Sequence, residues 1–243
     1  MKAITLFFLV IPFIVVAQKT KEEVAKSIDA GHDQYAAIAK QIWEFAEVGY
    51  QETKSSALLQ ETLAKAGFKI EKGVAGMPTA FVASYGTGKP VIGILGEFDA
   101  LPGVSQDAVP EVKKVEGRTA GHACGHHLFG TASSAAAIAV KNWLIANKKQ
   151  GTIRFYGTPA EEGGAGKVYM VREGFFNDVD VVFHWHPGSQ NNASAGTSLA
   201  NKTGKFRFTG IAAHAAASPE RGRSALDGVE AMNDMVNMMR EHV

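Results

Sequence analysis

The sequence predicts an α/β fold with a layered helix–sheet–helix arrangement. Two observations predict it. An unbroken apolar run at 91–95 is typical of a strand buried on both faces, and helix patterns precede and follow that run along the chain. The length of 243 residues permits one large domain or a domain and a half.

The individual elements follow from local patterns. Helices are predicted where apolar residues recur every three or four positions or where strong helix formers gather, at 19–47, 52–66, 131–145, 167–173 and 224–242. Strands are predicted at 68–71, 79–85, 91–95, 152–157, 179–183 and 203–208. The last helix carries an apolar stripe that we expect to pack into a core, formed by Leu226, Val229, Met232, Val236 and Met239.

The N-terminus has the layout of a secretory signal peptide. Lys2 supplies a positive start, residues 4–16 are nearly all apolar, and Ala17 is a small residue suited to cleavage. The apolar run is shorter than the roughly 20 residues that a membrane-spanning helix needs. We therefore expect residues 1–17 to be removed and the mature protein to be exported, either periplasmic or secreted.

The charge of the mature chain excludes some classes of partner. Removal of Lys2 leaves 24 of the 25 basic residues, against 24 acidic residues, so the mature chain is formally neutral. Nothing in this balance favours nucleic acid or an anionic membrane as a partner. The single cysteine, Cys124, cannot form an internal disulfide, which leaves it either as an exposed liability or as a residue kept for its chemistry.

Cys124 lies in a segment that favours metal binding. Residues 121–130 combine this cysteine with His122, His126 and His127 among several glycines. Thiolate and imidazole are ligands that borderline-soft divalent metals prefer, and glycines allow a loop to bend sharply. The alternative is a small buried cysteine beside hydrogen-bonded histidines.

Ligand-type side chains also follow three of the predicted strands, as the pairs Glu97 and Asp99, Glu161 and Glu162, and His184 and His186. The carboxyl ends of such strands are where α/β folds place their sites, so their convergence with the cysteine-histidine segment predicts a metal centre. Each acidic pair on its own is also compatible with a solvated loop. Asp99 suits a role in orienting a ligating imidazole. His186, beside Pro187, is a better ligand candidate than His184.

Adjacent glutamates in extended backbone point to opposite sides, so Glu161 and Glu162 are expected to do different jobs. One can bind a metal while the other acts as a general base for metal-assisted hydrolysis.

Five segments together resemble the aminoacylase/carboxypeptidase-type metallopeptidases in their amidohydrolase branch. They are Gly96-Glu-Phe-Asp-Ala-Leu-Pro-Gly103, Gly121-His-Ala-Cys-Gly-His126, Pro159-Ala-Glu-Glu-Gly-Gly-Ala-Gly166, Trp185-His-Pro187 and Gly210-Ile-Ala-Ala-His-Ala-Ala-Ala-Ser-Pro219 with Gly222-Arg-Ser-Ala225. They follow the family's order over nearly the whole mature chain. The Trp-His-Pro segment looks most like the enzymes of this branch that act on p-aminobenzoyl-glutamate.

The resemblance implies a ligand set for a pair of divalent metals, formed by Cys124, His126, Glu162 and His186. It also implies Glu161 as the general base, Asp99 as the residue behind a ligating histidine, and His214 as the group that stabilises the oxyanion of a partner subunit's substrate. The donor types leave zinc, manganese and cobalt open. The implied fold is a zinc-exopeptidase-like catalytic domain over 18–197, with an inserted α+β lid and dimerisation domain beginning at 198–243.

The resemblance further implies additional lid strands, a return to the catalytic domain and a last histidine ligand beyond Val243. We therefore expect the chain to be an N-terminal portion of an enzyme that is a homodimer when complete. The leading hypothesis is a metal-dependent amidohydrolase that cleaves an amide between an acyl or aroyl group and an amino acid in a small-molecule substrate. The alternatives are an inactive metal- or ligand-binding protein of the same fold and a thiol-based redox protein using Cys124.

Overall fold

The computed structural model describes residues 11–193 and 196–242, with side chains described from residue 20 onward. The chain forms two compact units, Met1–Asn191 and Asn192–Val243, and each is described by itself. Of the predicted signal peptide, residues 1–10 lie outside the described residues, and residues 11–17 form the beginning of a helix. Export remains a prediction.

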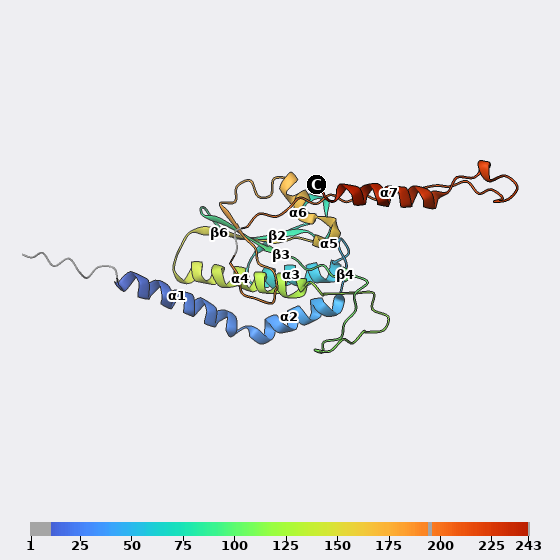
Figure 1. Cartoon of the computed structure of the whole chain (residues 1–243). Helices are drawn as coiled ribbons and strands as arrows, with labels where there is room; N and C mark the ends of the chain where they lie inside the picture. Colours follow the sequence, from blue (N-terminus) through green and yellow to red (C-terminus); the bar gives the residue numbers. More distant parts are fainter. Residues whose placement is uncertain (1–10, 194–195, 243) are drawn as a thin grey trace, which may run out of the picture. The chain divides into compact units, whose positions relative to one another are not determined.

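The first unit is built on a five-stranded sheet with the order β1-β2-β6-β3-β7 (Figure 1). Its strands are β1 (Lys69–Lys72), β2 (Phe81–Thr87), β3 (Val91–Gly96), β6 (Gly151–Gly157) and β7 (Val181–Phe183). Strand β3 lies between β6 and β7 and runs parallel to both, while β1 and β2 are antiparallel to their neighbours. Two short strands, β4 (Leu101–Pro102) and β5 (Ala120–Gly121), pair separately.

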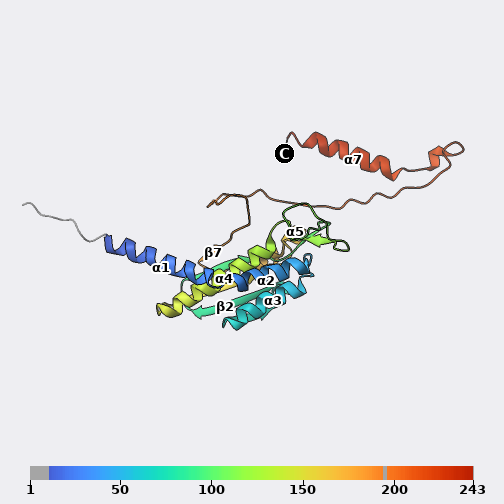
Figure 2. The same ribbon diagram turned by 90° about the horizontal axis from the view of Figure 1, so that it is seen from below.

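Helices cover this sheet on both sides, which confirms the predicted layered fold (Figures 1 and 2). The helices of the first unit are α1 (Ile11–Asp29), α2 (His32–Phe45), α3 (Thr53–Lys65), α4 (His126–Ala146), α5 (Glu161–Gly164) and α6 (Gly166–Arg172), with a 3₁₀ turn at η1 (Val74–Gly76). Figure 1 shows α2, α3 and α4 on one side of the sheet and α5 and α6 on the other. Gly67 and Gly174 follow α3 and α6 with positive φ.

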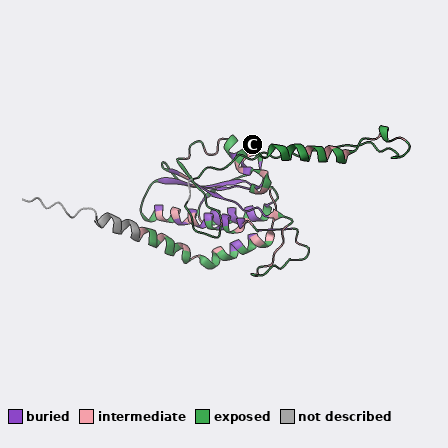
Figure 3. Ribbon diagram, viewed as in Figure 1, coloured by how far each residue is buried: buried purple, intermediate pink, exposed green. Residues whose placement is uncertain are grey.

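Two apolar clusters, one on each side of the sheet, form the core (Figure 3). Beneath α2, α3 and α4, Phe81 and Phe155 stack with their ring centroids 5.6 Å apart. On the other side, Tyr156 and Met170 are fully buried, and Phe129 from the beginning of α4 joins their cluster. Helix α4 is long and apolar enough to span a bilayer, but it packs directly on β3 and β6 in the sheet of this unit.

Two glycines bring the beginning of α4 close to the carboxyl end of β3. A Cβ atom built on Gly130 would lie 2.6 Å from the backbone oxygen of Glu97. That distance is shorter than atoms tolerate, so only glycine permits the approach at Gly130. A Cβ atom on Gly96 would lie 3.4 Å from the Cα atom of Gly130 and 2.4 Å from the ring of Phe155 in the neighbouring strand β6. The result is that α4 begins directly beside the residues that follow β3.

The structure corrects two predicted helix boundaries. The helix predicted over 19–47 is two helices, α1 and α2, separated by Ala30 and Gly31, because glycine lacks the helix propensity to continue through this point. The helix predicted over 131–145 begins earlier, at His126, since Gly125 takes up a left-handed conformation (φ 79°) and serves as the N-cap. Two histidines of the predicted ligand loop therefore lie in the first turn of α4.

The second unit contains a 3₁₀ turn, η2 (Pro219–Arg221), and the helix α7 (Ala225–Met239), which Ser224 caps by accepting a hydrogen bond from the backbone N–H of Asp227. The strand predicted over 203–208 does not form, because no described segment pairs with it to complete a ladder. The predicted core packing of the α7 stripe is also wrong for the described residues: none of its members is buried, and Leu226 is 63% exposed.

The close approach at Gly130 gives a testable prediction. In a free helix, Gly130→Ala would be stabilising by about 1 kcal/mol, but the contact with the Glu97 backbone reverses the sign. We expect the variant to lose about 1–3 kcal/mol of unfolding free energy in urea denaturation, as overpacked sites do. Gly188→Ala is the control, because its nearest neighbour is 4.0 Å away. An unchanged or higher stability for Gly130→Ala would contradict the close packing.

Candidate metal centre

The carboxyl ends of β3, β6 and β7 meet at one edge of the sheet. In the parallel register, Gly96 pairs with Gly157 and Ile94 pairs with Phe183, so the three strands end at nearly the same level. The predicted ligand-type residues come directly after these ends. The first turn of α4 faces the same edge, because of the close approach at Gly130.

His126 contacts several of the residues that gather at this edge of the sheet. Its side chain is completely buried, and its Nδ1 atom lies 3.0 Å from both the backbone oxygen and the Oδ1 atom of Asp99. Because both of those oxygens are acceptors, Nδ1 carries the proton and donates it, as predicted for Asp99. The Nε2 atom is therefore left to face a different group.

That group is the carboxylate of Glu97, which is only 2% exposed. Its Oε2 atom lies 2.9 Å from His126 Nε2, yet neither atom has a partner placed for a hydrogen bond. In neutral imidazole with a protonated Nδ1, Nε2 presents a lone pair, which a carboxylate oxygen repels. A positive charge, either a proton or a metal ion, must therefore lie between these two atoms.

More carboxylate oxygens surround the same nitrogen. Glu161 Oε2 lies 3.8 Å and Glu162 Oε1 lies 4.0 Å from His126 Nε2. Like Glu97 Oε2 and His126 Nε2, Glu162 Oε1 is buried and has no hydrogen-bond partner among the described residues. Native structures leave few such atoms unsatisfied. Unpartnered atoms converging on one point fit a cation.

Cys124 and His186 complete the cluster on its exposed side. The Cys124 Sγ atom lies 3.5 Å from His186 Nε2, and the rings of His126 and His186 are 5.5 Å apart. Two sets of ligand atoms, Cys124–His126–His186 and Glu97–His126–Glu161, each lie within 4.8 Å of one another. Thiolate, imidazole and carboxylate donors at this spacing fit divalent metal ions.

The local charges act strongly on this centre. Burial alone would lower the pKa of His126, but its contacts with Asp99 and Glu97 outweigh burial and raise the pKa to about 10. Burial, followed by the neighbouring Glu162, raises the pKa of the Cys124 thiol to about 11. Burial, followed by the charge of Glu97, raises the pKa of Glu161. A neighbouring carboxylate contributes to each of these three pKa shifts, after burial for the Cys124 thiol and for Glu161.

The segment that carries Glu161 and Glu162 was predicted to be extended. It forms instead the short turn α5, within which Glu162 (φ −70°, ψ 72°) departs from helical backbone angles. The expected alternation of the two side chains is therefore wrong, and both carboxylates approach His126 from the same turn. The backbone N–H of Glu162 donates to Asp99 Oδ2 at 2.9 Å, which ties α5 to the residue behind His126.

Glu52, at the beginning of α3, also positions this segment. Its carboxylate is completely buried and accepts hydrogen bonds of 2.8 Å from the backbone N–H of Ala160 and from the hydroxyl of Thr79. Ala160 has a left-handed conformation (φ 55°) that is unusual for alanine, and this contact fixes it. The sequence analysis did not identify Glu52, because its role in holding the segment of Glu161 is revealed only by its contact with Ala160, 108 positions away in the sequence.

The structure brings the predicted ligands Cys124, His126, Glu162 and His186 to the same edge, with Asp99 in the predicted contact. His184 lies beside them, with Nε2 4.0 Å from Glu97 Oε1. His214 belongs to the second unit, where its Nδ1 accepts from the backbone N–H groups of Ala216 and Ala217, and its role at a substrate remains a prediction. Sequence reasoning did not identify Glu97 as a direct contact of His126.

The other two histidines of the loop do not join the cluster. His122 contacts the backbone oxygen of Ile42 through Nε2 at 3.1 Å, and its ring lies 5.2 Å from that of His127. Burial lowers the pKa of both residues to about 4. They are therefore neutral at physiological pH.

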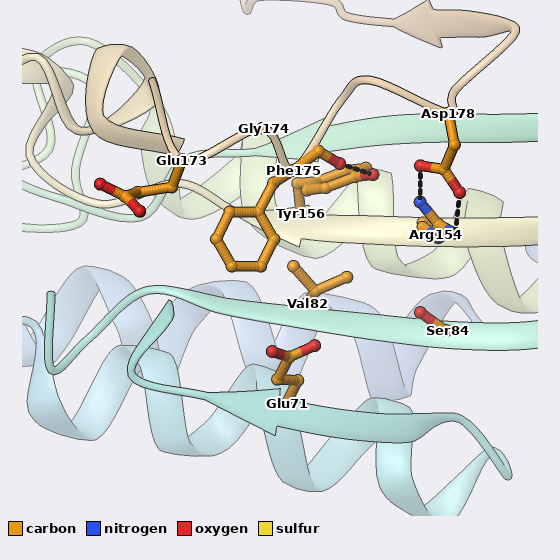
Figure 4. Close-up of a pocket in the computed structure, with 9 residues that line it drawn as sticks. All are labelled: Glu71, Val82, Ser84, Arg154, Tyr156, Glu173, Gly174, Phe175 and Asp178. Atoms are coloured by element: carbon orange, nitrogen blue, oxygen red, sulfur yellow. Dashed lines mark hydrogen bonds and ion pairs between the residues drawn. The ribbon is translucent and has the colours of Figure 1, made fainter. Parts of the chain in front are cut away.

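A separate cavity of about 370 Å³ lies on the α6 side of the sheet (Figure 4). Its wall includes the ion pair of Arg154 with Asp178, which has two N–O contacts of 2.6 Å, and the hydroxyl of Tyr156, which donates to the backbone oxygen of Phe175. None of its lining residues belongs to the ligand cluster. These contacts join β6 to the segment after α6.

Comparison with known proteins identifies the family. Residues 93–232, more than half of the chain, match the model of peptidase family M20/M25/M40. The chain belongs to this family. It is 49% identical to one of the subunits of p-aminobenzoyl-glutamate hydrolase from Escherichia coli K12, over 89% of this chain and 45% of that protein.

Two further similar proteins support the family assignment. The chain is 31% identical to the mouse (Mus musculus) Xaa-Arg dipeptidase, over 92% of this chain and 51% of that protein. It also resembles the crystal structure of a dinuclear metal binding peptidase of the M20 family from Bacillus subtilis. That likeness has a TM-score of 0.54 and 27% identity, and it covers 66% of this chain and 44% of that one. The chain thus spans about half the length of these relatives.

Glu52 gives a prediction of pH dependence. Burial raises the pKa of its carboxyl group above the ordinary value, so ionisation opposes folding. This contribution to stability is fully present below the unfolded pKa and is lost as the pH rises through the folded pKa. We expect Glu52→Gln, which cannot ionise, to gain stability relative to the parent as the pH rises above about 4, the unfolded pKa of a glutamate.

The measurement is urea denaturation of both metal-free proteins at several pH values. The exposed Glu71 supplies the control variant, Glu71→Gln, for which we expect no such trend. A stability difference for Glu52→Gln that does not change with pH would contradict the assignment.

Proposed function

We propose that the chain is a metal-dependent amidohydrolase that cleaves the amide between an acyl or aroyl group and an amino acid. The carrying observation is the contact of His126 Nε2 with Glu97 Oε2, two buried atoms without a hydrogen-bond partner among the described residues, in the middle of a thiolate, imidazole and carboxylate cluster that a metal ion would fit. The identity to the E. coli p-aminobenzoyl-glutamate hydrolase chain supports p-aminobenzoyl-glutamate or a related N-acyl amino acid as the substrate.

Cys124, His126, Glu162 and His186 would hold two divalent metal ions, with zinc and manganese favoured by the donors and cobalt left open. When bound, the metals supply Lewis acidity that polarises the amide carbonyl and lowers the pKa of water. Asp99 keeps the proton of His126 on Nδ1 and so directs Nε2 toward the metal position.

Glu161 would act as the general base. Its side chain is 44% exposed, in contrast to the 17% of Glu162, so it is the glutamate of the pair that reaches toward solvent and substrate. The raised pKa, caused by burial and then by Glu97, brings the group nearer to the range in which it can both accept and return a proton. His214 would stabilise the oxyanion of a partner subunit's substrate.

We also propose that the mature protein is exported and that the complete enzyme is a homodimer. The layout of residues 1–17 supports export. The E. coli relative is named as a subunit, which supports assembly with another chain but does not distinguish a homodimer from a mixed complex.

The base assignment is tested by Glu161→Gln. We expect the variant to lose about 10²–10⁴-fold in turnover of p-aminobenzoyl-glutamate, because the amide cannot accept the proton, while metal content by elemental analysis is retained. The control is Glu173→Gln, at an exposed position outside the cluster. Full turnover by Glu161→Gln would contradict the assignment. A parent protein that binds metal but hydrolyses no amide would favour the binding-protein alternative.

The role of Asp99 is tested by Asp99→Ala. Without its carboxylate, the His126 ring loses the side-chain acceptor that holds its orientation, and we expect metal affinity to fall about 10–100-fold. Competition with a chromophoric chelator measures this affinity. Asp107→Ala, which removes an acid paired with Lys113 outside the cluster, should bind as the parent does. Equal affinities for both variants would refute the role of Asp99.

A further inference from the structure

A buried ion pair borders the metal centre and is not used by the mechanism above. Glu97 comes directly after β3, and its Oε1 atom forms an ion pair with the ammonium of Lys167 in the first turn of α6. Glu97 is 2% exposed and the Lys167 side chain is 27% exposed. A carboxylate buried to this degree needs a compensating charge, and Lys167 provides one for Oε1.

The second oxygen of Glu97 is not paired with Lys167. Oε2 faces His126 Nε2 at 2.9 Å and has no hydrogen-bond partner among the described residues. Two donor atoms bound to one ion at roughly 2.1 Å, with an angle of about 90–110° between them, lie roughly 3.0–3.4 Å apart. The separation of Oε2 and Nε2 is close to this range, so both atoms are placed to share one ion.

We propose that Glu97 is a further metal ligand through Oε2 and that Lys167 is the positioning residue that holds it through Oε1. This inference deepens the proposed function and rests on it. The two roles follow from the geometry. Lys167 binds Oε1 of Glu97 and so directs Oε2 toward His126. A ligating carboxylate whose free oxygen bonds to an outer partner is the arrangement by which proteins fix and tune such ligands.

The charge balance of the centre favours the same assignment. Four carboxylates, from Glu97, Asp99, Glu161 and Glu162, lie within 4.0 Å of a nitrogen of His126, and the Cys124 thiol borders them. Two divalent ions bring four positive charges against these five acidic groups. Lys167 supplies a fifth positive charge, beside Glu97. Of the four carboxylates, only Asp99 is more buried than Glu97.

The test measures zinc affinity by chelator competition and the absorption spectrum of the cobalt-loaded protein, for the parent, Glu97→Gln, Lys167→Met and Lys167→Arg. We expect Glu97→Gln and Lys167→Met each to weaken one metal site by about 10–100-fold and to change the cobalt spectrum. Lys167→Arg should restore much of the affinity, because it keeps the cation. Lys89→Met, which breaks an ion pair with Asp180 outside the cluster, is the matched control.

The double variant separates positioning from a general loss of charge. If Lys167 acts through Glu97, adding Lys167→Met to Glu97→Gln should cost little further affinity. Additive losses would overturn the positioning role. Unchanged affinity and spectrum in Glu97→Gln, with a parent that binds metal, would overturn the ligand role alone. A parent that binds no metal would overturn the proposed function itself. Circular dichroism of each metal-free variant checks folding, and Glu97→Asp replaces Glu97→Gln where that variant unfolds.

Discussion

The contact of one imidazole with two buried carboxylates is the constraint on which the rest of the site depends. His126 donates from Nδ1 to Asp99 and directs Nε2 at Glu97. Because both carboxylates come from the segment after β3, the ring is fixed relative to the sheet. Because His126 is in the first turn of α4, the same contact also fixes the beginning of the longest core helix. A single side chain thus joins the chemistry of the site to the packing of two layers.

The remaining donors depend on connections that lie behind the cluster. The second oxygen of Asp99 accepts a hydrogen bond from the backbone N–H of Glu162. The carboxylate of Glu52 accepts one from the backbone N–H of Ala160. These two carboxylates hold the turn that carries Glu161 and Glu162 by its backbone, so the turn does not depend on the charges of its own side chains. The glycines at 96 and 130 allow the third component, α4, to approach. The centre is therefore held by two carboxylates that bind the backbone around α5 and by the close approach of α4 to the end of β3.

The sequence was sufficient to predict the residue types and the edge of the sheet where they gather. Parallel strands end together, so ligand-type residues after 91–95, 152–157 and 179–183 had to come close. Residues whose roles depend on long-range contacts were not predictable in the same way. Glu52 reads as an ordinary helix-start acid, and Lys167 as a surface cation on a short helix. Only the folded chain shows that each is paired with a group more than 60 positions away.

The errors have a common physical origin. A period of three or four predicts that a segment is helical, but it does not say where a glycine ends the helix, and Gly31 divides 19–47 in two. Likewise, the apolar stripe of α7 indicates a helix that could pack on a core, and the pattern at 203–208 indicates a strand that could join a sheet. Among the described residues of the second unit, no core buries the stripe and no strand pairs with 203–208. Patterns predict element type where the element is self-contained and fail where it depends on a neighbour.

Buried oxygens without partners link metal binding to folding. Glu97 Oε2 and Glu162 Oε1 are removed from water without a hydrogen bond in return, which destabilises the metal-free chain. Lys167 and the proton on His126 offset part of that cost. An ion that bonds to these atoms removes the rest, and because it binds only the folded arrangement, its binding free energy adds to stability. The buried glutamates that would make the site tight for metal are therefore the same groups that weaken the fold without it.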